Sequence, residues 1–156
     1  MLSLKAMEPI KIIECPRDAM QGIKTFIPTA RKVSYIQALL RVGFDSIDFG
    51  SFVSPKAIPQ MQDTAAVLDQ LDLSKTDSKL LAIIANVQGA KDAASHEPIQ
   101  YLGFPFSISE NFQMRNTHKT IAESLVTLQE ILEIADQNQK EVIAYLSMGF
   151  GNPYGD

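Results

Sequence analysis

The chain has 156 residues, of which 46% are hydrophobic and 21% are charged, and its formal net charge is −4. This length allows one domain with a substantial core, and the slightly acidic balance argues against a nucleic-acid-binding surface or a basic membrane-binding surface. No apolar run approaches the roughly 20 residues that a membrane span needs, so we expect neither nucleic acid nor membrane among the partners.

The location is predicted from the N-terminus and the cysteine content. Residues 1–11 lack the long apolar segment and the small-residue cleavage site of a secretory signal. The single cysteine, Cys15, cannot form an internal disulfide, which fits a reducing compartment. We therefore predict a cytoplasmic protein, in which Cys15 is a small packed residue.

Apolar segments alternate with helical patterns along the chain. Strands are predicted at residues 10–15, 46–50, 79–85, 98–106 and 141–148. Helices are predicted at residues 29–42, 65–71, 87–95 and 119–138. Most of the strand segments are nearly continuous apolar runs, which is typical of parallel strands covered on both faces. No linker divides the chain, so residues 1–156 are expected to form a single α/β domain.

Two architectures fit this alternation: an open doubly wound sheet and a (β/α)8 barrel. No GxGxxG or GxxxxGK[ST] motif follows the first strand, so the dinucleotide and P-loop interpretations lose their main support. The connections 51–62 and 107–118 are predicted to be long loops, and loops of this length in a compact domain are more often functional than idle.

Polar residues lie near or after the carboxyl end of every predicted strand. They are Arg17 and Asp18, Asp48, Asn86, residues 107–110, and Asn152 with Tyr154. In a (β/α)8 barrel the chemistry lies at the carboxyl ends of the strands, where these residues would gather. Adjacent Arg17 and Asp18 either form a surface ion pair or face a metal or a charged substrate, because isolated buried charges are costly.

Several motifs resemble one family. The segment ECPRDAMQ at 14–21 resembles the GPRDGLQ first-strand signature of the 3-hydroxy-3-methylglutaryl-CoA (HMG-CoA) lyases, and GFDSIDFGSFVSPKAIPQM at 43–61 resembles their second strand and loop. The resemblance continues in order through NVQG at 86–89, SE at 109–110, Phe112, Asn116 and GNPY at 151–154. It spans residues 10–154 and implies a (β/α)8 barrel, of the TIM-barrel type.

The resemblance implies an activity: divalent-metal-dependent cleavage of HMG-CoA to acetyl-CoA and acetoacetate, a reaction of leucine degradation. Asp18 is then the metal ligand, since a hard carboxylate oxygen suits Mg²⁺ or Mn²⁺. Arg17 would bind substrate and stabilise the developing negative oxygen, and Asp48, in place of the family's glutamate, would orient Arg17 as a further catalytic residue.

The other candidate residues, for contacts to an acyl-CoA substrate, are Gln21, Lys56, Asn86, Asn116 and Tyr154. Two alternative functions remain. One is a related synthase of the isopropylmalate or homocitrate type, which condenses acetyl-CoA with a 2-oxo acid. The other is a non-catalytic half-barrel remnant that acts as an interaction module.

The length is short for a full barrel, which takes about 250 residues. We therefore expect only about the first five βα units, the N-terminal portion of the barrel. The family's HxH metal pair is absent from the sequence. The isolated chain is predicted to be inactive or weakly active, and to form either a homo-oligomer or a complex with a complementing C-terminal half.

Overall fold

The computed structural model describes residues 10–153, which form one parallel sheet with helices between the strands. The strands are β1 (Ile13–Glu14), β2 (Ser46–Ser51), β3 (Lys79–Ile83), β4 (Ile99–Ser107) and β5 (Glu141–Ser147). The helices are α1 (Pro16–Gln21), α2 (Thr29–Leu40), the 3₁₀ turn η1 (Pro59–Met61), α3 (Thr64–Leu68), α4 (Val87–Ala94), α5 (Glu110–Thr117) and α6 (Ile121–Gln137). Tyr154 lies outside the described residues.

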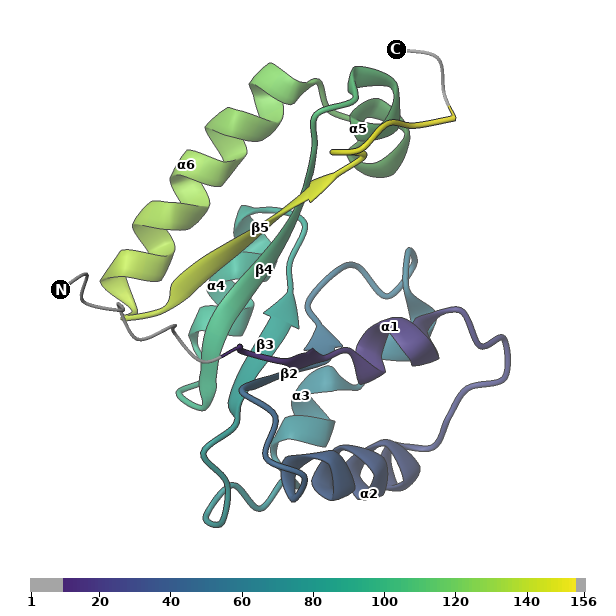
Figure 1. Ribbon diagram of the computed structural model, residues 1–156, viewed down its shortest axis with the longest axis vertical. Helices are drawn as coiled ribbons and strands as arrows, with labels where there is room; N and C mark the ends of the chain where they lie inside the picture. The colour runs from purple at the N-terminus through teal and green to yellow at the C-terminus, as the bar shows by residue number, and fades with distance from the viewer. Residues whose placement is uncertain (1–9, 154–156) are drawn as a thin grey trace, which may run out of the picture.

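The strand order is β1-β2-β3-β4-β5, and each strand pairs in parallel with its neighbour in the sequence. Such an order needs a crossover after every strand, which the helices supply. Figure 1 shows α6 running alongside β4 and β5, whereas α1 and α5 lie at the carboxyl ends of β1 and β4. The alternation of five strands with helices agrees with the sequence prediction.

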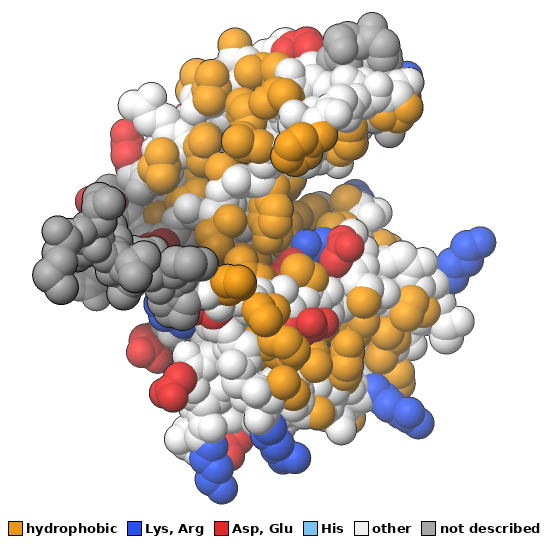
Figure 2. Space-filling model, viewed as in Figure 1, with side chains coloured by type: hydrophobic (Ala, Val, Ile, Leu, Met, Phe, Trp, Pro, Cys, Tyr) orange, Lys and Arg blue, Asp and Glu red, His pale blue; other side chains and the backbone are white. Residues whose placement is uncertain are grey.

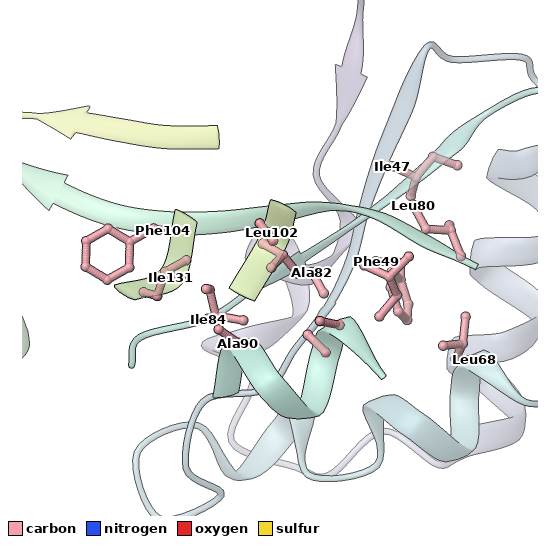
Figure 3. Packing of buried hydrophobic residues seen from close by; sticks show 14 of the residues in the cluster. Ile47, Phe49, Leu68, Leu80, Ala82, Ile84, Ala90, Leu102, Phe104 and Ile131 are labelled. Atoms are coloured by element: carbon pink, nitrogen blue, oxygen red, sulfur yellow. The ribbon is translucent and has the colours of Figure 1, made fainter. Parts of the chain in front are cut away.

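The main core lies between one face of the sheet and the helices. Alternate strand residues point to opposite faces, and the buried residues on the helix side are Ile47, Phe49, Leu80, Ala82, Ile84, Leu102 and Phe104. They pack with Leu68 of α3, Ala90 of α4 and Ile131 of α6. Figure 3 shows Phe104 next to Ile131. This core fixes the helices on the outer side and leaves the other face of the sheet to form an inner wall.

The inner wall carries the alternate residues of the same strands. Leu81, Ile83 and Tyr101 form a second buried cluster, against which Ile143 and Tyr145 pack. Figure 2 shows many hydrophobic side chains on the face turned toward the viewer, with acidic and basic side chains close together among them. Polar and apolar groups thus share this face.

One sequence prediction about the elements is wrong, because much of the supposed loop 107–118 is helical, as α5. The segment after the first strand, for which no element was predicted, is helical as well, as α1. In α5 the Oγ of Ser109 accepts a hydrogen bond from the N–H of Phe112, and His118 ends the helix in the left-handed conformation. These caps, together with Pro16 at the start of α1, stabilise short helices that have no long apolar stripe.

The predicted first strand, 10–15, is also shorter and more exposed than expected. Only residues 13 and 14 pair with β2, and Ile13 is 40% exposed because β1 is an edge strand. Cys15 is exposed, not packed as predicted. Among residues 10–153, none of the helices combines the length and the apolar character that a membrane crossing requires.

Candidate active site

The candidate site begins where β1 turns into α1. Pro16 occupies the start of α1, where its missing N–H leaves no helical hydrogen bond unmade. The next two residues are Arg17 and Asp18, which therefore lie in the first turn at the carboxyl end of β1. The side chain of Arg17 is only 12% exposed, whereas that of Asp18 is 65% exposed.

Asp48 reaches the same place from β2, where it is fully buried. A β-bulge follows it, since Asp48 pairs with Leu81 but Gly50 pairs with Ala82. Bulges bend a strand and re-aim its side chains, and they are common next to active sites. Asp48 thereby belongs to the inner wall, beside α1.

Arg17 joins the two elements through its guanidinium. Its Nε donates to both carboxylate oxygens of Asp48 at 3.1 Å, and its Nη2 donates to Asp48 Oδ2 at 2.5 Å. Its Nη1 donates to Asp18 Oδ1 at 3.1 Å and to Gln21 Oε1 at 3.0 Å. Gln21 in turn donates to Asp18 Oδ1 at 2.8 Å. The structure therefore brings together four of the predicted site residues.

Burial and charge oppose each other in the Arg17–Asp48 pair. Burial by itself would lower the pKa of the Arg17 guanidinium, but the hydrogen bond and charge of Asp48 raise that pKa above its ordinary value. Burial raises the pKa of the Asp48 carboxyl, and Arg17 offsets this rise only in part. The pair fixes the orientation of Arg17 at a cost in solvation.

Tyr145 is a residue that the sequence analysis missed. Burial, followed by the nearby charge of Asp48, raises the pKa of Tyr145 to about 12, so its hydroxyl stays protonated at neutral pH. Gly103 makes room for it, because a Cβ there would lie 3.2 Å from Tyr145 Cε2 and 2.5 Å from Ile83 Cδ1. The alternation of side chains along 141–148 could have revealed Tyr145 as an inner-wall residue.

A second feature at this end of the sheet is a cleft of about 340 Å³ between the segment 51–65 and α4. Its lining includes Ser51, Phe52, Asn86 and Gly89. Asn86 begins α4, and its Oδ1 accepts a hydrogen bond from the N–H of Gly89 at 2.8 Å. The cleft therefore brings the predicted Asn86 close to the segment that contains Lys56.

The remaining predicted residues are more dispersed. Lys56 is exposed in the segment between β2 and η1, and Asn116 is exposed on α5. Within residues 10–153 there is no group of three or more His, Cys, Asp or Glu side chains that could hold a metal ion.

The fold and site define a class: about half of a parallel (β/α) barrel, with a buried arginine–aspartate pair at the carboxyl ends of its first strands. No protein-family model matches the chain. It is 35% identical over 148 residues to the cytoplasmic 3-hydroxy-3-methylglutaryl-CoA lyase of Danio rerio, and this match covers 93% of this chain and 43% of that protein. It is 34% identical over 145 residues to the mitochondrial hydroxymethylglutaryl-CoA lyase of Arabidopsis thaliana, covering 92% of this chain and 31% of that protein.

Solved structures give the same result. The HMG-CoA lyase of Bacillus subtilis matches with a TM-score of 0.85 and 34% identity, covering 94% of this chain and 49% of that one. An A. baumannii HMG-CoA lyase in complex with coenzyme A and 3-methylmalate matches with a TM-score of 0.84 and 32% identity, over 92% and 47% of the two chains. The chain is therefore similar, over nearly its whole length, to the N-terminal part of hydroxymethylglutaryl-CoA lyases.

These matches confirm the predicted fold, because five parallel strands with their helices overlay about half of lyase barrels. The chain spans between about a third and a half of the length of the curated relatives it matches.

Proposed function

We propose that this chain supplies the arginine and one metal-ligating carboxylate of a hydroxymethylglutaryl-CoA lyase, which cleaves HMG-CoA to acetyl-CoA and acetoacetate. The observation that carries the proposal is the buried Arg17–Asp48 pair, which directs the rest of the guanidinium toward the exposed Asp18. The similarity to named lyases supports the choice of reaction.

Arg17 has the geometry of an electrostatic catalyst. Its contacts within residues 10–153 use four of its five N–H groups and leave one N–H of Nη2 for a substrate oxygen. Loss of the tertiary hydroxyl proton and breakage of the carbon–carbon bond move negative charge onto oxygen. A guanidinium that is already oriented by Asp48 stabilises that charge without reorganising during the reaction.

Tyr145 supplements Arg17 in this proposal. With a pKa of about 12, its hydroxyl is a hydrogen-bond donor at neutral pH. Its place on the inner wall suits a contact to a carbonyl or alkoxide oxygen of the substrate. Gln21, which bonds to both Arg17 and Asp18, would hold these two side chains in their relative orientation.

Asp18 fits a divalent cation as one ligand. It is an exposed hard carboxylate, of the type that Mg²⁺ and Mn²⁺ prefer. When bound, such a cation would polarise the substrate oxygens. Because the described residues contain no group of three ligands, the other protein ligands must come from beyond residues 10–153 or from a partner.

The cleft beside α4 supports an acyl-CoA substrate. We propose that Asn86 contacts the substrate there, and that Lys56, on the neighbouring segment, contacts a phosphate of coenzyme A. Asn116 and Tyr154 are proposed as further substrate contacts. One solved lyase with this fold contains coenzyme A. A cytoplasmic location also remains a proposal, because the relatives include both cytoplasmic and mitochondrial enzymes.

We further propose that three additional βα units complete the site, from a complementing C-terminal half. Both sheet edges are open within the described chain, and the half-exposed apolar residues on them suit continued strand pairing. A homo-oligomer is the alternative partner.

The test is to mix the purified chain with the C-terminal half of the Bacillus subtilis lyase and to measure Mg²⁺-dependent acetyl-CoA release from HMG-CoA. The completed barrel should be active, and Arg17→Met should lower kcat on the order of 10²–10³-fold. Arg41→Met is the matched control, since Arg41 is an exposed arginine just after α2, and it should change little.

Other outcomes would contradict the proposal. Condensation of acetyl-CoA with a 2-oxo acid, without cleavage of HMG-CoA, would favour a synthase. A folded, completed barrel in which neither Mg²⁺ nor Asp18→Asn alters activity or melting temperature would favour a non-catalytic remnant.

A further inference from the structure

The connection between α1 and α2, residues 22–28, is held by one buried side chain. Within the described chain, residues 24–27 make no backbone–backbone hydrogen bonds. The amide of Gln60, in η1, supplies partners for three backbone groups instead. Its Oε1 accepts from the N–H of Ile27 at 2.8 Å, and its Nε2 donates to the carbonyls of Ile23 at 2.8 Å and Thr25 at 3.0 Å.

Both ends of this amide are engaged. Gln60 is 3% exposed, and its one carbonyl and both N–H groups are engaged. The three groups that it binds belong to residues 23, 25 and 27, on either side of a bend at residues 24 and 25. Gln60 therefore supplies the hydrogen-bond partners that this connection does not find in other backbone groups.

A buried ion pair fixes the far end of the connection to the same segment. Lys32, in the first turn of α2, is 2% exposed and donates to the backbone carbonyl of Gln60 and to Asp63 Oδ1 at 2.5 Å. Thr29 donates to the other oxygen of Asp63 at 2.7 Å. The ammonium of Lys32 also lies 4.2 Å from the ring centre of Phe26.

The near end of the connection leads directly into α1. That helix packs against η1, and both Met20 of α1 and Met61 of η1 are buried. α1 has only six residues, too few to keep a fixed position without tertiary contacts. The chain that leaves it is fastened to Gln60 within two residues, at Ile23.

We infer that Gln60 is a positioning residue for Arg17 and Asp18: its amide, anchored by the Lys32–Asp63 pair, sets where α1 lies over β2. This placement lets the guanidinium of Arg17 reach the carboxylate of Asp48 on both oxygens. The value of the placement for catalysis rests on the proposed function, but the placement itself is a property of the chain alone.

The test replaces Gln60 by methionine, which keeps the size of the side chain and removes its three hydrogen bonds. The readout is the solvent exchange rate of the Arg17 Nε–H proton by NMR, assigned by its loss in Arg17→Lys. The exchange rate is measured under conditions in which circular dichroism shows the variant to be folded. We expect exchange at least tenfold faster, because the contact to Asp48 loosens.

Gln37→Met is the matched control. Gln37 also bridges backbone groups with its amide, to the N–H and carbonyl of Asp72 at 2.8 and 2.9 Å, but on a different connection. It should leave the exchange of Arg17 unchanged. If Gln60→Met lowers the melting temperature yet leaves Arg17 exchange unchanged, Gln60 is only structural and the inference is wrong.

A milder variant covers the case in which Gln60→Met does not fold. Gln60→Asn keeps the amide but is one methylene too short to reach all three groups, so we expect an intermediate increase in exchange. An Arg17 signal identical to that of the unmodified chain would overturn the inference. Because the readout needs no turnover, its failure is distinct from an absence of lyase activity.

Discussion

Asp48 is fully buried, and within residues 10–153 its carboxylate bonds only to Arg17. We predict that Asp48→Asn destabilises the fold by about 3 kcal/mol, because it leaves a mostly buried guanidinium with only the exposed Asp18 as counter-ion. Urea unfolding measures the loss. Asp18→Asn is the control: this carboxylate is largely exposed, so the change should be below about 1 kcal/mol. Equal losses in the two variants would contradict the prediction.

The same pair should prove unnecessary for folding. Burial raises the pKa of Asp48 in spite of Arg17, so the ionised carboxylate keeps part of its solvation cost, whereas Asp48 raises the pKa of Arg17 in spite of burial. We therefore expect the double variant Arg17→Met with Asp48→Leu to be at least as stable as Asp48→Asn, and to recover most of the lost stability in urea. A double variant less stable than Asp48→Asn would contradict this expectation.

Tyr145 gives a prediction for alkaline pH. Its pKa is raised to about 12 in the folded chain from an ordinary value near 10. Its contribution to stability is therefore complete below pH 10 and is lost as the pH rises toward 12. In an absorbance titration at 295 nm, one of the four tyrosines should ionise last, and Tyr145→Phe should remove that step. A last step that persists in Tyr145→Phe would contradict the assignment.

The sequence predicts part of this site well. Arg17, Asp18 and Asp48 could be placed together because the carboxyl ends of neighbouring parallel strands meet at one edge of the sheet, whereas Gln21 was added only through the resemblance to the lyases. Gln60 and Lys32 could not, since their partners are backbone groups and side chains about 30 residues away. Cys15 was misjudged because an apolar run does not reveal that its strand is an exposed edge.

Among the elements, α4 depends on a close approach to the segment after β2. A Cβ at Gly89 would lie 2.6 Å from the carbonyl oxygen of Phe52. Gly89→Ala would favour the helix by about 1 kcal/mol, but this backbone clash should outweigh the gain and lower the melting temperature. Gly22→Ala, where nothing lies within 4 Å, should be neutral or slightly stabilising. A rise in melting temperature for Gly89→Ala would contradict the prediction.

Helix α6 begins with a complete capping box. The side chain of Thr120 accepts from the N–H of Glu123 at 3.1 Å, and Glu123 accepts from the N–H of Thr120 at 2.8 Å. We expect Thr120→Ala to lower the free energy of unfolding by about 1 kcal/mol in urea, and Thr120→Ser to restore most of it. Equal stability of the two variants would mean that the hydroxyl does not cap the helix.

The helices that the sequence predicts are those with an apolar stripe, such as α2 and α6. In α6 the apolar spacing predicts the helix but not fully its buried face, because Leu125 and Leu132 are exposed whereas Ile131 and Ala135 are buried. α1 and α5 escape prediction because Pro16 at the start of α1, the Ser109 cap of α5 and tertiary contacts stabilise them more than periodicity does. The strands β2 to β4 can be predicted from the sequence because they are apolar runs. The length of β1 cannot, because it depends on how many of its residues pair with β2.

For the whole molecule, the open edge at β5 has a measurable consequence. Leu146 is 64% exposed on this strand, where unpaired backbone groups can also accept another strand. We predict concentration-dependent association of the isolated chain in sedimentation experiments, and a shift toward monomer in Leu146→Lys. Tyr35→Lys, which changes a 42% exposed residue on α2, is the control. An equal effect of both substitutions would place the contact elsewhere.

The order of the strands also bears on synthesis at the ribosome. Every strand pairs with the strand that precedes it in the sequence, so each βα unit can dock as soon as it has emerged, without waiting for a distant segment. Paired strands are separated by one crossover each, as with Leu80 and Ile99 or Tyr101 and Glu141, so the sheet can grow stepwise from the N-terminus. Arg17 and Asp48 would then meet as soon as β2 has docked, making their pairing an early event in the life of the chain.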